Sequence, residues 1–156
     1  MNINFNEFKI LFYITVFLLI GFYAIDSKLK ETKQINKIEE KIKALNKENI
    51  ESIDIDSIYG SYLEIQFPLK ITNKDSISRI INYIKKGKDY KILGHPQTNR
   101  IHHMIIKSKK GDLIMEVWGS NIKETYILFK DPQNRDIKTM RNDSLGIYIN
   151  SGKSFN

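Results

Sequence analysis

The sequence predicts an α+β protein in which a single transmembrane helix and a helical stalk precede a mostly antiparallel sheet of five to seven strands with one packed helix. Residues 10–25 contain no charged side chain, although 28% of the chain is charged. Residues 26–50 contain neither glycine nor proline, and beyond them apolar residues alternate with period two between turn signals. We expect a short tail at 1–9, an anchor at 10–25, a stalk at 26–50, an α+β domain at 51–150 and a frayed C-terminus at 151–156.

The apolar run at 10–25 is expected to be a retained membrane anchor. Eleven of its sixteen residues are Ile, Leu, Val or Phe, and each favours insertion by about 0.3 to 0.6 kcal/mol at the helix centre. The run would form a helix of about 24 Å, which Phe5 and Phe8 extend toward the hydrocarbon thickness of about 30 Å. Tyr13 and Tyr23 lie near its ends, where amphipathic rings favour the interface. The pattern therefore predicts a single-pass protein of the cell membrane.

A cleaved export signal and a core helix of a soluble protein fit the residues of this run less well. A signal peptidase site needs small residues one and three places before the cut. A cut after Ala24 would place Phe22 three places before it, and a cut after Ser27 would place Ile25 there, and both residues are large. A soluble amphipathic helix needs a polar stripe, but only Thr15 and two tyrosines interrupt the run. A retained anchor is therefore the preferred interpretation.

Two opposing signals bear on the orientation of the anchor. Several lysines follow it, and the positive-inside rule would place them in the cytoplasm together with the domain. Acidic residues are interspersed among these lysines, and a short tail before an anchor is a common arrangement for a domain outside. We expect the domain to lie outside the cytoplasm, in a bacterial envelope, with the cytoplasmic orientation as the alternative. The lysines are Lys28, Lys30, Lys33, Lys37, Lys41 and Lys43.

The stalk carries a narrow apolar stripe formed by Ile35, Ile38, Ile42 and Leu45. Spacings of three, four and three residues form the seam that coiled coils use. The stripe covers only about one and a half heptads, so a homodimer through residues 35–45 would be weak. Packing of this helix on the chain's own domain is the preferred interpretation.

The first half of the domain is predicted to contain two strands and a helix. Apolar and polar residues alternate over 53–56 and again over 62–67, on either side of a break at Gly60. The helix follows Thr72 and ends near Gly87, a typical stop signal. Thr72 with Asp75 forms the expected capping box. The apolar stripe of this helix consists of Ile77, Ile80, Ile81 and Ile84.

The second half of the domain is predicted to be strands joined by turns. A hairpin over 101–118 surrounds a Lys-Lys-Gly-Asp turn, in which Gly111 supplies a positive φ. A further strand at 124–130 ends at the Asp-Pro turn that follows. A final hairpin is expected to turn at Asn142 and Asp143, with Leu145, Ile147 and Ile149 on its inner face.

The residue types argue against most catalytic chemistry. The chain has no cysteine, so disulfides, thiolate metal sites and cysteine nucleophiles are excluded. It also lacks a Gly-x-Ser-x-Gly elbow and a glycine-rich phosphate loop. We therefore expect a non-enzymatic protein with no cofactor. The alternative is a small envelope hydrolase or metal-dependent enzyme that uses Asp54 and Asp56 with His95 and His102; His103 points to the opposite strand face from His102.

Surface residues that predict a binding function fall into two sets. Basic groups that follow the helix or surround the hairpin turn could contact an anionic surface or a partner: Lys85, Lys86, Lys88, Lys91, Lys107, Lys109 and Lys110. Nucleic acid is not expected, because aromatic residues are not interleaved with these basic ones. Trp118, Tyr59 and Tyr62 lie beside glycines and are candidate partner anchors, although such residues are often only the edge of a core. The sequence thus predicts a membrane-anchored binding domain with a protein partner, as an envelope protein or an accessory subunit of a membrane complex.

Overall fold

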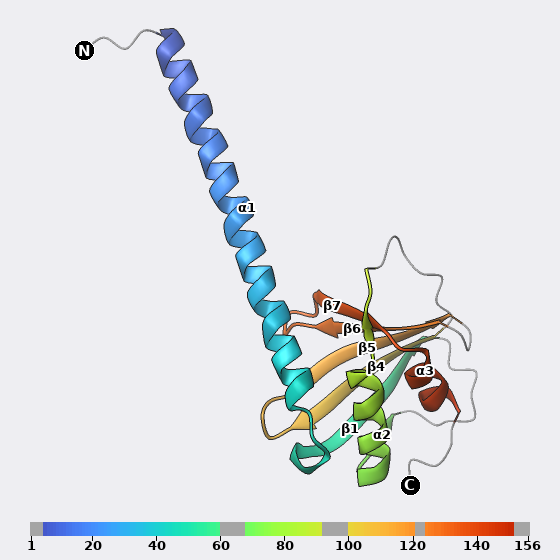
Figure 1. The fold of residues 1–156 in the computed structure, drawn as a ribbon. Helices are drawn as coiled ribbons and strands as arrows, with labels where there is room; N and C mark the ends of the chain where they lie inside the picture. The colour runs from blue at the N-terminus through green and yellow to red at the C-terminus, as the bar shows by residue number, and fades with distance from the viewer. Residues whose placement is uncertain (1–4, 60–67, 92–99, 121–123, 152–156) are drawn as a thin grey trace. The chain divides into compact units, whose positions relative to one another are not determined.

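The computed structural model describes residues 5–59, 68–91, 100–120 and 124–151. The chain divides into two compact units, Met1–Gln34 and Ile35–Asn156. Figure 1 shows the elements, which in chain order are α1 (Phe5–Ala44), the 3₁₀ turn η1 (Lys47–Asn49), β1 (Ile50–Tyr59), β2 (Leu69–Ile71), α2 (Lys74–Lys85), β3 (Lys88–Asp89), β4 (Arg100–Ser108), β5 (Leu113–Ser120), β6 (Glu124–Lys130), β7 (Asp136–Arg141) and α3 (Asp143–Asn150).

The first unit consists of the N-terminal part of α1, and its apolar side chains are exposed. Between Ile10 and Ile25 the large apolar side chains are 52% to 80% exposed. The Thr15 hydroxyl donates to the carbonyl oxygen of Leu11 at 2.9 Å, so this polar group is satisfied within the helix. Among the described helices, α1 is the one that is long and apolar enough to cross a membrane. The prediction of a long apolar N-terminal helix is confirmed.

The second unit is built on a seven-stranded, open, antiparallel sheet, as predicted. The strand order is β2-β1-β4-β5-β6-β7-β3, and every neighbouring pair is antiparallel. The four strands from β4 to β7 follow the chain as a meander, and Gly111 turns β4 into β5 with a φ of 98°. The hairpin predicted for 101–118 and the strand predicted for 124–130 are therefore confirmed.

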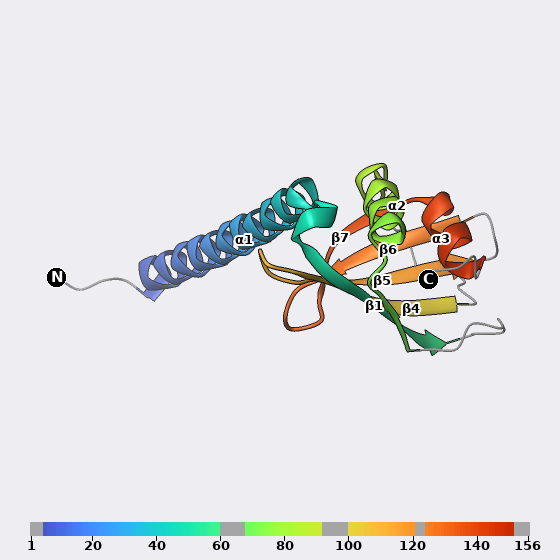
Figure 2. The ribbon, with the colours of Figure 1, turned by 90° about the horizontal axis from the view of Figure 1, so that it is seen from below.

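The core lies between one face of this sheet and the helices. Figure 2 shows α2 and α3 on the same side of the sheet. Ile53 faces Ile106 across β1 and β4, and Met115 faces Phe129 across β5 and β6. Alternate residues of each strand point to this face, so their side chains are buried against the helices. The fully buried side chains include Ile53, Ile55, Met104, Ile106, Met115, Ile127 and Phe129 from the sheet and Ile77, Ile80 and Ile84 from α2.

The predicted stripe of α2 is confirmed, but the predicted capping box is wrong. Asn73, not Thr72, is the N-cap, because its side-chain oxygen accepts hydrogen bonds from the backbone N–H groups of Asp75 at 2.9 Å and Ser76 at 3.0 Å. Asparagine is among the most favourable N-cap residues. At the other end of α2, the Gly87 N–H donates to the carbonyl oxygen of an α2 residue, close to the predicted stop.

Residues 143–150 form the helix α3, so the strand predicted for the end of the domain is wrong. The Asn142 side chain accepts a hydrogen bond from the Leu145 N–H at 3.2 Å and caps the helix. Burial follows helical spacing: Leu145, Tyr148 and Ile149 are buried, whereas Ile147, which was expected to point inward, is 47% exposed.

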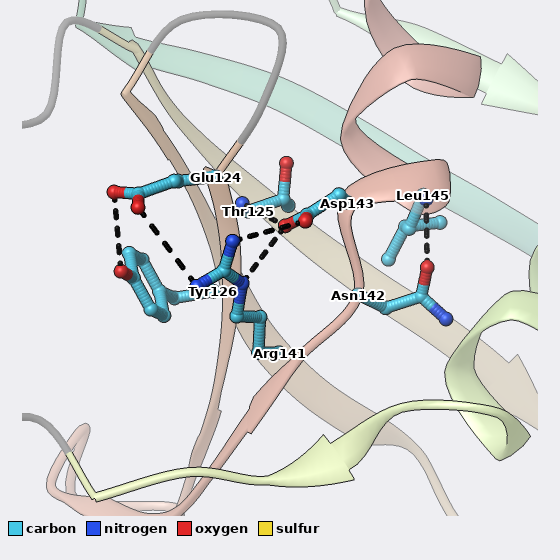
Figure 3. A network of polar contacts seen from close by, with 7 residues as sticks. All are labelled: Glu124, Thr125, Tyr126, Arg141, Asn142, Asp143 and Leu145. Atoms are coloured by element: carbon cyan, nitrogen blue, oxygen red, sulfur yellow. Dashed lines mark hydrogen bonds and ion pairs between the residues drawn. The ribbon is translucent and has the colours of Figure 1, made fainter.

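A polar network fastens the first turn of α3 to β6 and β7 (Figure 3). The Asp143 carboxylate accepts a hydrogen bond from the Thr125 N–H at 2.9 Å and pairs with the Arg141 guanidinium at 3.1 Å. Burial opposes the charge of Asp143, but these two contacts outweigh it and hold the pKa of its carboxyl below the usual range. An anion in the first turn also complements the helix dipole. These contacts, made across the fold, favour the helix over a strand.

The helix predicted for residues 26–50 ends at Ala44, and its last turns belong to the globular unit. Ile38, Ile42 and Leu45 are 6% to 7% exposed and lie in the core cluster of the domain. The apolar stripe of the predicted stalk thus packs on the chain's own domain. A homodimer through residues 35–45 stays a prediction, and it would have to form without removing these side chains from that core.

Candidate functional site

The face of the sheet opposite α2 and α3 carries half-buried aliphatic and aromatic side chains, and we call it the open face. In the β4–β5 register Ile105 faces Ile114, and Ile101 faces Trp118. Trp118 in turn faces Tyr126 of β6, which is 5% exposed. Figure 2 shows α2 and α3 on the other side of the sheet. The predicted partner anchor Trp118 is half-buried on this face.

Hydrogen bonds hold the Trp118 indole in a fixed orientation on the open face. Its ring N–H donates to Glu116 Oε2 at 2.7 Å. The Lys130 ammonium pairs with Glu116 at 3.2 Å and with Asp136 at 2.7 Å, and its side chain is only 8% exposed. Burial disfavours the Lys130 charge, but the two carboxylates outweigh burial and raise the pKa of Lys130 above its usual value.

The side chains of the other two predicted anchors lie outside the part of the chain that the structure describes. Tyr59 is the last residue of β1, and its side chain is not among the described ones. Tyr62 lies outside the described residues, as do the predicted second strand at 62–67 and His95.

A separate groove of about 840 Å³ lies among the end of α1, η1, α2 and the β4–β5 turn, and we call it the basic groove. Its lining includes five cationic side chains and one carboxylate, that of Asp75. Asparagine amides and a serine hydroxyl add further hydrogen-bond donors, and no aromatic residue is among the described residues that line it. The five cations are Lys43, Lys47, Arg79, Lys85 and Lys110.

Hydrogen bonds from two lysine side chains to backbone carbonyl oxygens join the walls of the basic groove. The Lys74 ammonium at the start of α2 donates to the carbonyl oxygens of Lys47 at 3.1 Å and Ile50 at 2.7 Å. The Lys41 ammonium donates to the carbonyl oxygen of Asp112 at 2.7 Å, so the end of α1 is joined to the β4–β5 turn. The groove is therefore formed within one unit by elements that are far apart in the sequence.

Among the described residues of the domain, five Lys and Arg side chains pair with carboxylates, whereas the five groove cations do not. In contrast, Lys138 pairs with Glu39 and with Asp89, each at 2.7 Å, and Lys107 pairs with Asp54 at 2.8 Å. Excess positive charge that is not neutralised internally raises the local concentration of anions.

The predicted basic residues separate into three groups. Lys85 and Lys110 line the basic groove, whereas Lys107 is engaged by Asp54 on the open face. The remaining predicted lysines, Lys86, Lys88, Lys91 and Lys109, are exposed outside the groove lining. Sequence reasoning missed three groove cations, Lys43, Lys47 and Arg79. Arg79 could have been singled out from the sequence, because it lies four residues after Asp75 on the polar face of α2.

Among the described residues of the alternative enzyme hypothesis, His102 lies on the opposite face of the sheet from Asp54 and Asp56. A hydrogen bond from Lys107, aided by one from Ser52, lowers the pKa of the Asp54 carboxyl and keeps it ionised. His102 is 2% exposed on the helix-covered face, and His103 lies on the opposite face. Within the part of the chain that the structure describes, no three His, Asp or Glu side chains are placed to hold a metal ion.

The fold and these surfaces define an α+β domain that follows an apolar helix, with a fixed tryptophan on one face and a cationic groove on another. Comparison with protein-family models, with curated proteins and with solved structures finds no match to this chain. Its function must therefore be inferred from the chain's own residues.

Proposed function

We propose that this chain is a single-pass membrane protein whose α+β domain lies outside the cytoplasm and works by binding a protein partner. The apolar run of α1 carries the proposal. Its large apolar side chains are more than half exposed from Ile10 to Ile25, an arrangement that water disfavours and a bilayer satisfies. Lys9 precedes this run, and Asp26 and Lys30 follow it as an exposed ion pair at 2.6 Å, so charged groups flank the apolar segment.

The open face is the surface that best fits a protein partner. Tryptophan is enriched among the residues that dominate binding energy at protein interfaces, and a preorganised side chain loses little entropy on binding. The Trp118 indole is held by Glu116, and in the strand register it lies between Ile101 of β4 and Tyr126 of β6. Such a surface supports binding to another envelope protein or to a subunit of a membrane complex.

The anchor is tested by fractionation of cells that produce the full chain. The wild type should stay in the membrane pellet after alkaline carbonate washing. The variant Leu18→Arg/Leu19→Arg places two charges at the centre of the run, each costing about 2.5 to 3.5 kcal/mol of insertion, and should move largely to the soluble fraction. Leu18→Ile/Leu19→Ile is the matched control and should behave as wild type. Complete extraction of the wild type by carbonate would contradict the anchor.

The binding surface is tested by photo-crosslinking in native membranes. A photoreactive residue at Ile114, on the open face, should capture one defined neighbour. The same residue at Lys86, exposed on the helix side, should not capture that neighbour. Trp118→Ala should abolish the Ile114 product while leaving the chain in the membrane. Recovery of only lipid and abundant proteins at both positions would contradict the proposed partner.

A further inference from the structure

We infer that the basic groove binds a linear phosphate polymer, a ligand distinct from the protein partner proposed for the open face. The charge of the groove is strongly imbalanced. Five cations and one carboxylate line about 840 Å³, and none of the cations is neutralised by a carboxylate among the described residues. Exposed charges of one sign held around a concavity attract a ligand of the opposite sign.

The donors in the groove suit phosphate oxygens. Four of the five cations are lysines, whose compact ammonium groups act as point charges for phosphate, and Arg79 adds a planar fork that can bind two oxygens at once. Asn46, Asn49, Asn82 and Ser78 add neutral donors between the cations. A ligand with a negative charge at each repeat could therefore contact several donors in sequence.

The lining also distinguishes this ligand from different anionic macromolecules. Bound nucleic-acid bases stack on aromatic side chains, and none of the described residues that line the groove is aromatic. Acidic protein segments usually add aromatic or large apolar anchors, whereas the large apolar side chains of the described lining, Leu45 and Ile81, are each 6% exposed and belong to the core. A flat bilayer surface cannot enter a concavity bounded by several elements, but a narrow chain can.

The walls of the groove are preorganised, which favours binding. Lys74 ties α2 to η1 and Lys41 ties α1 to the β4–β5 turn, so the backbone that carries the cations is held before a ligand arrives. Preorganisation reduces the ordering cost that binding must overcome.

The experiment measures binding of labelled inorganic polyphosphate to the full chain in phosphatidylcholine nanodiscs by fluorescence anisotropy. The test variant is Lys47→Gln/Arg79→Gln/Lys85→Gln. The matched control is Lys86→Gln/Lys88→Gln/Lys91→Gln, which removes the same number of positive charges from exposed positions outside the groove lining. If each groove cation contributes about fivefold, the test variant should bind roughly 100-fold more weakly, whereas the control should change by less than about fivefold.

Each outcome supports or overturns the inference. Equal losses in the two variants would show attraction by net charge alone, and no binding by the wild type would reject the groove as a site for this polymer. Equal competition by poly-glutamate would reject phosphate in favour of an acidic peptide. Groove-dependent binding of phosphatidylglycerol vesicles without binding of polyphosphate would reject it in favour of lipid. These results do not depend on the carbonate and crosslinking tests, so failure here leaves the membrane anchor and open face to be judged separately.

Discussion

Replacing Gly146 with alanine tests whether α3 packs on β6 as the structure shows. In an exposed helix this change would stabilise by about 1 kcal/mol, because alanine is the better helix former. Here the new Cβ would overlap the Thr125 hydroxyl oxygen and lie 2.9 Å from Thr125 Cβ and 3.0 Å from its Cγ2. The hydroxyl can rotate away, but the Cβ of a central strand cannot.

The magnitude follows from this overlap. An ordinary contact with a Cβ is 3.4 Å or more, so α3 must move by about 0.5 Å from β6. Overpacking of this kind costs about 1 to 3 kcal/mol, and the buried position of Gly146 favours the upper part of that range. After the helical gain is subtracted, we expect Gly146→Ala to lower the free energy of unfolding by about 2 kcal/mol and the melting temperature by about 8 °C.

The assay is urea unfolding of the full chain in mild detergent, followed by the fluorescence of Trp118, the single tryptophan of the chain. Ser144→Ala, at an exposed position in the same helix, is the control and should change stability by less than about 0.5 kcal/mol. In a Thr125→Ala background the loss caused by Gly146→Ala should fall to about 1 kcal/mol, because only the Cβ contact remains. A Gly146→Ala protein as stable as the wild type would refute the packing of α3 and return residues 145–150 to the predicted strand.

Three further predictions follow from named contacts. The Asp143 carboxyl has a folded-state pKa below its ordinary value. The stability advantage of the wild type over Asp143→Asn should therefore be full above about pH 4 and should vanish as the pH falls through that lowered pKa. A stability advantage that grows in acid would contradict this sign. Ile42→Ala should lower the free energy of unfolding by about 2 to 4 kcal/mol without changing the oligomeric state seen by light scattering. Glu40→Ala, at an exposed position, should change neither the free energy of unfolding nor the oligomeric state. Joint substitution of Asp54, Asp56, His95 and His102 should leave any cellular phenotype intact once folding is confirmed by circular dichroism, and loss of that phenotype would favour the enzyme alternative.

Local patterns were enough to predict the elements whose stability is local. The α2 stripe repeats at helical spacing, and the β4–β5 hairpin alternates around a glycine that adopts a positive φ. The segment at 145–149 satisfied both periods at once, since apolar residues occupy alternate positions as well as positions spaced by three and four. The hydrogen bond between Asp143 and Thr125 favours the helix over the strand. These two residues are eighteen positions apart, so a local sequence pattern does not include both.

The basic groove was only half predicted for a similar reason. Lys85 and Lys110 stood out as members of basic clusters in the sequence. Lys43 and Lys47 come from α1 and η1, and they lie beside the α2 cations because of tertiary packing, to which the Lys74 contacts between α2 and η1 contribute. The open face was predicted through Trp118 alone, since strand register decides which side chains, Ile101 and Tyr126, lie beside it.

The most direct test of the membrane anchor and its orientation exploits the absence of cysteine from the chain. One cysteine is placed at Asn2, before the apolar run, or at the exposed Ser151, after the last helix. A membrane-impermeant maleimide is then added to intact and to lysed cells. A single span with the domain outside predicts that Ser151→Cys is labelled in both and that Asn2→Cys is labelled only after lysis. Labelling of both positions in intact cells would contradict a single span, and labelling of Ser151→Cys only after lysis would place the domain in the cytoplasm.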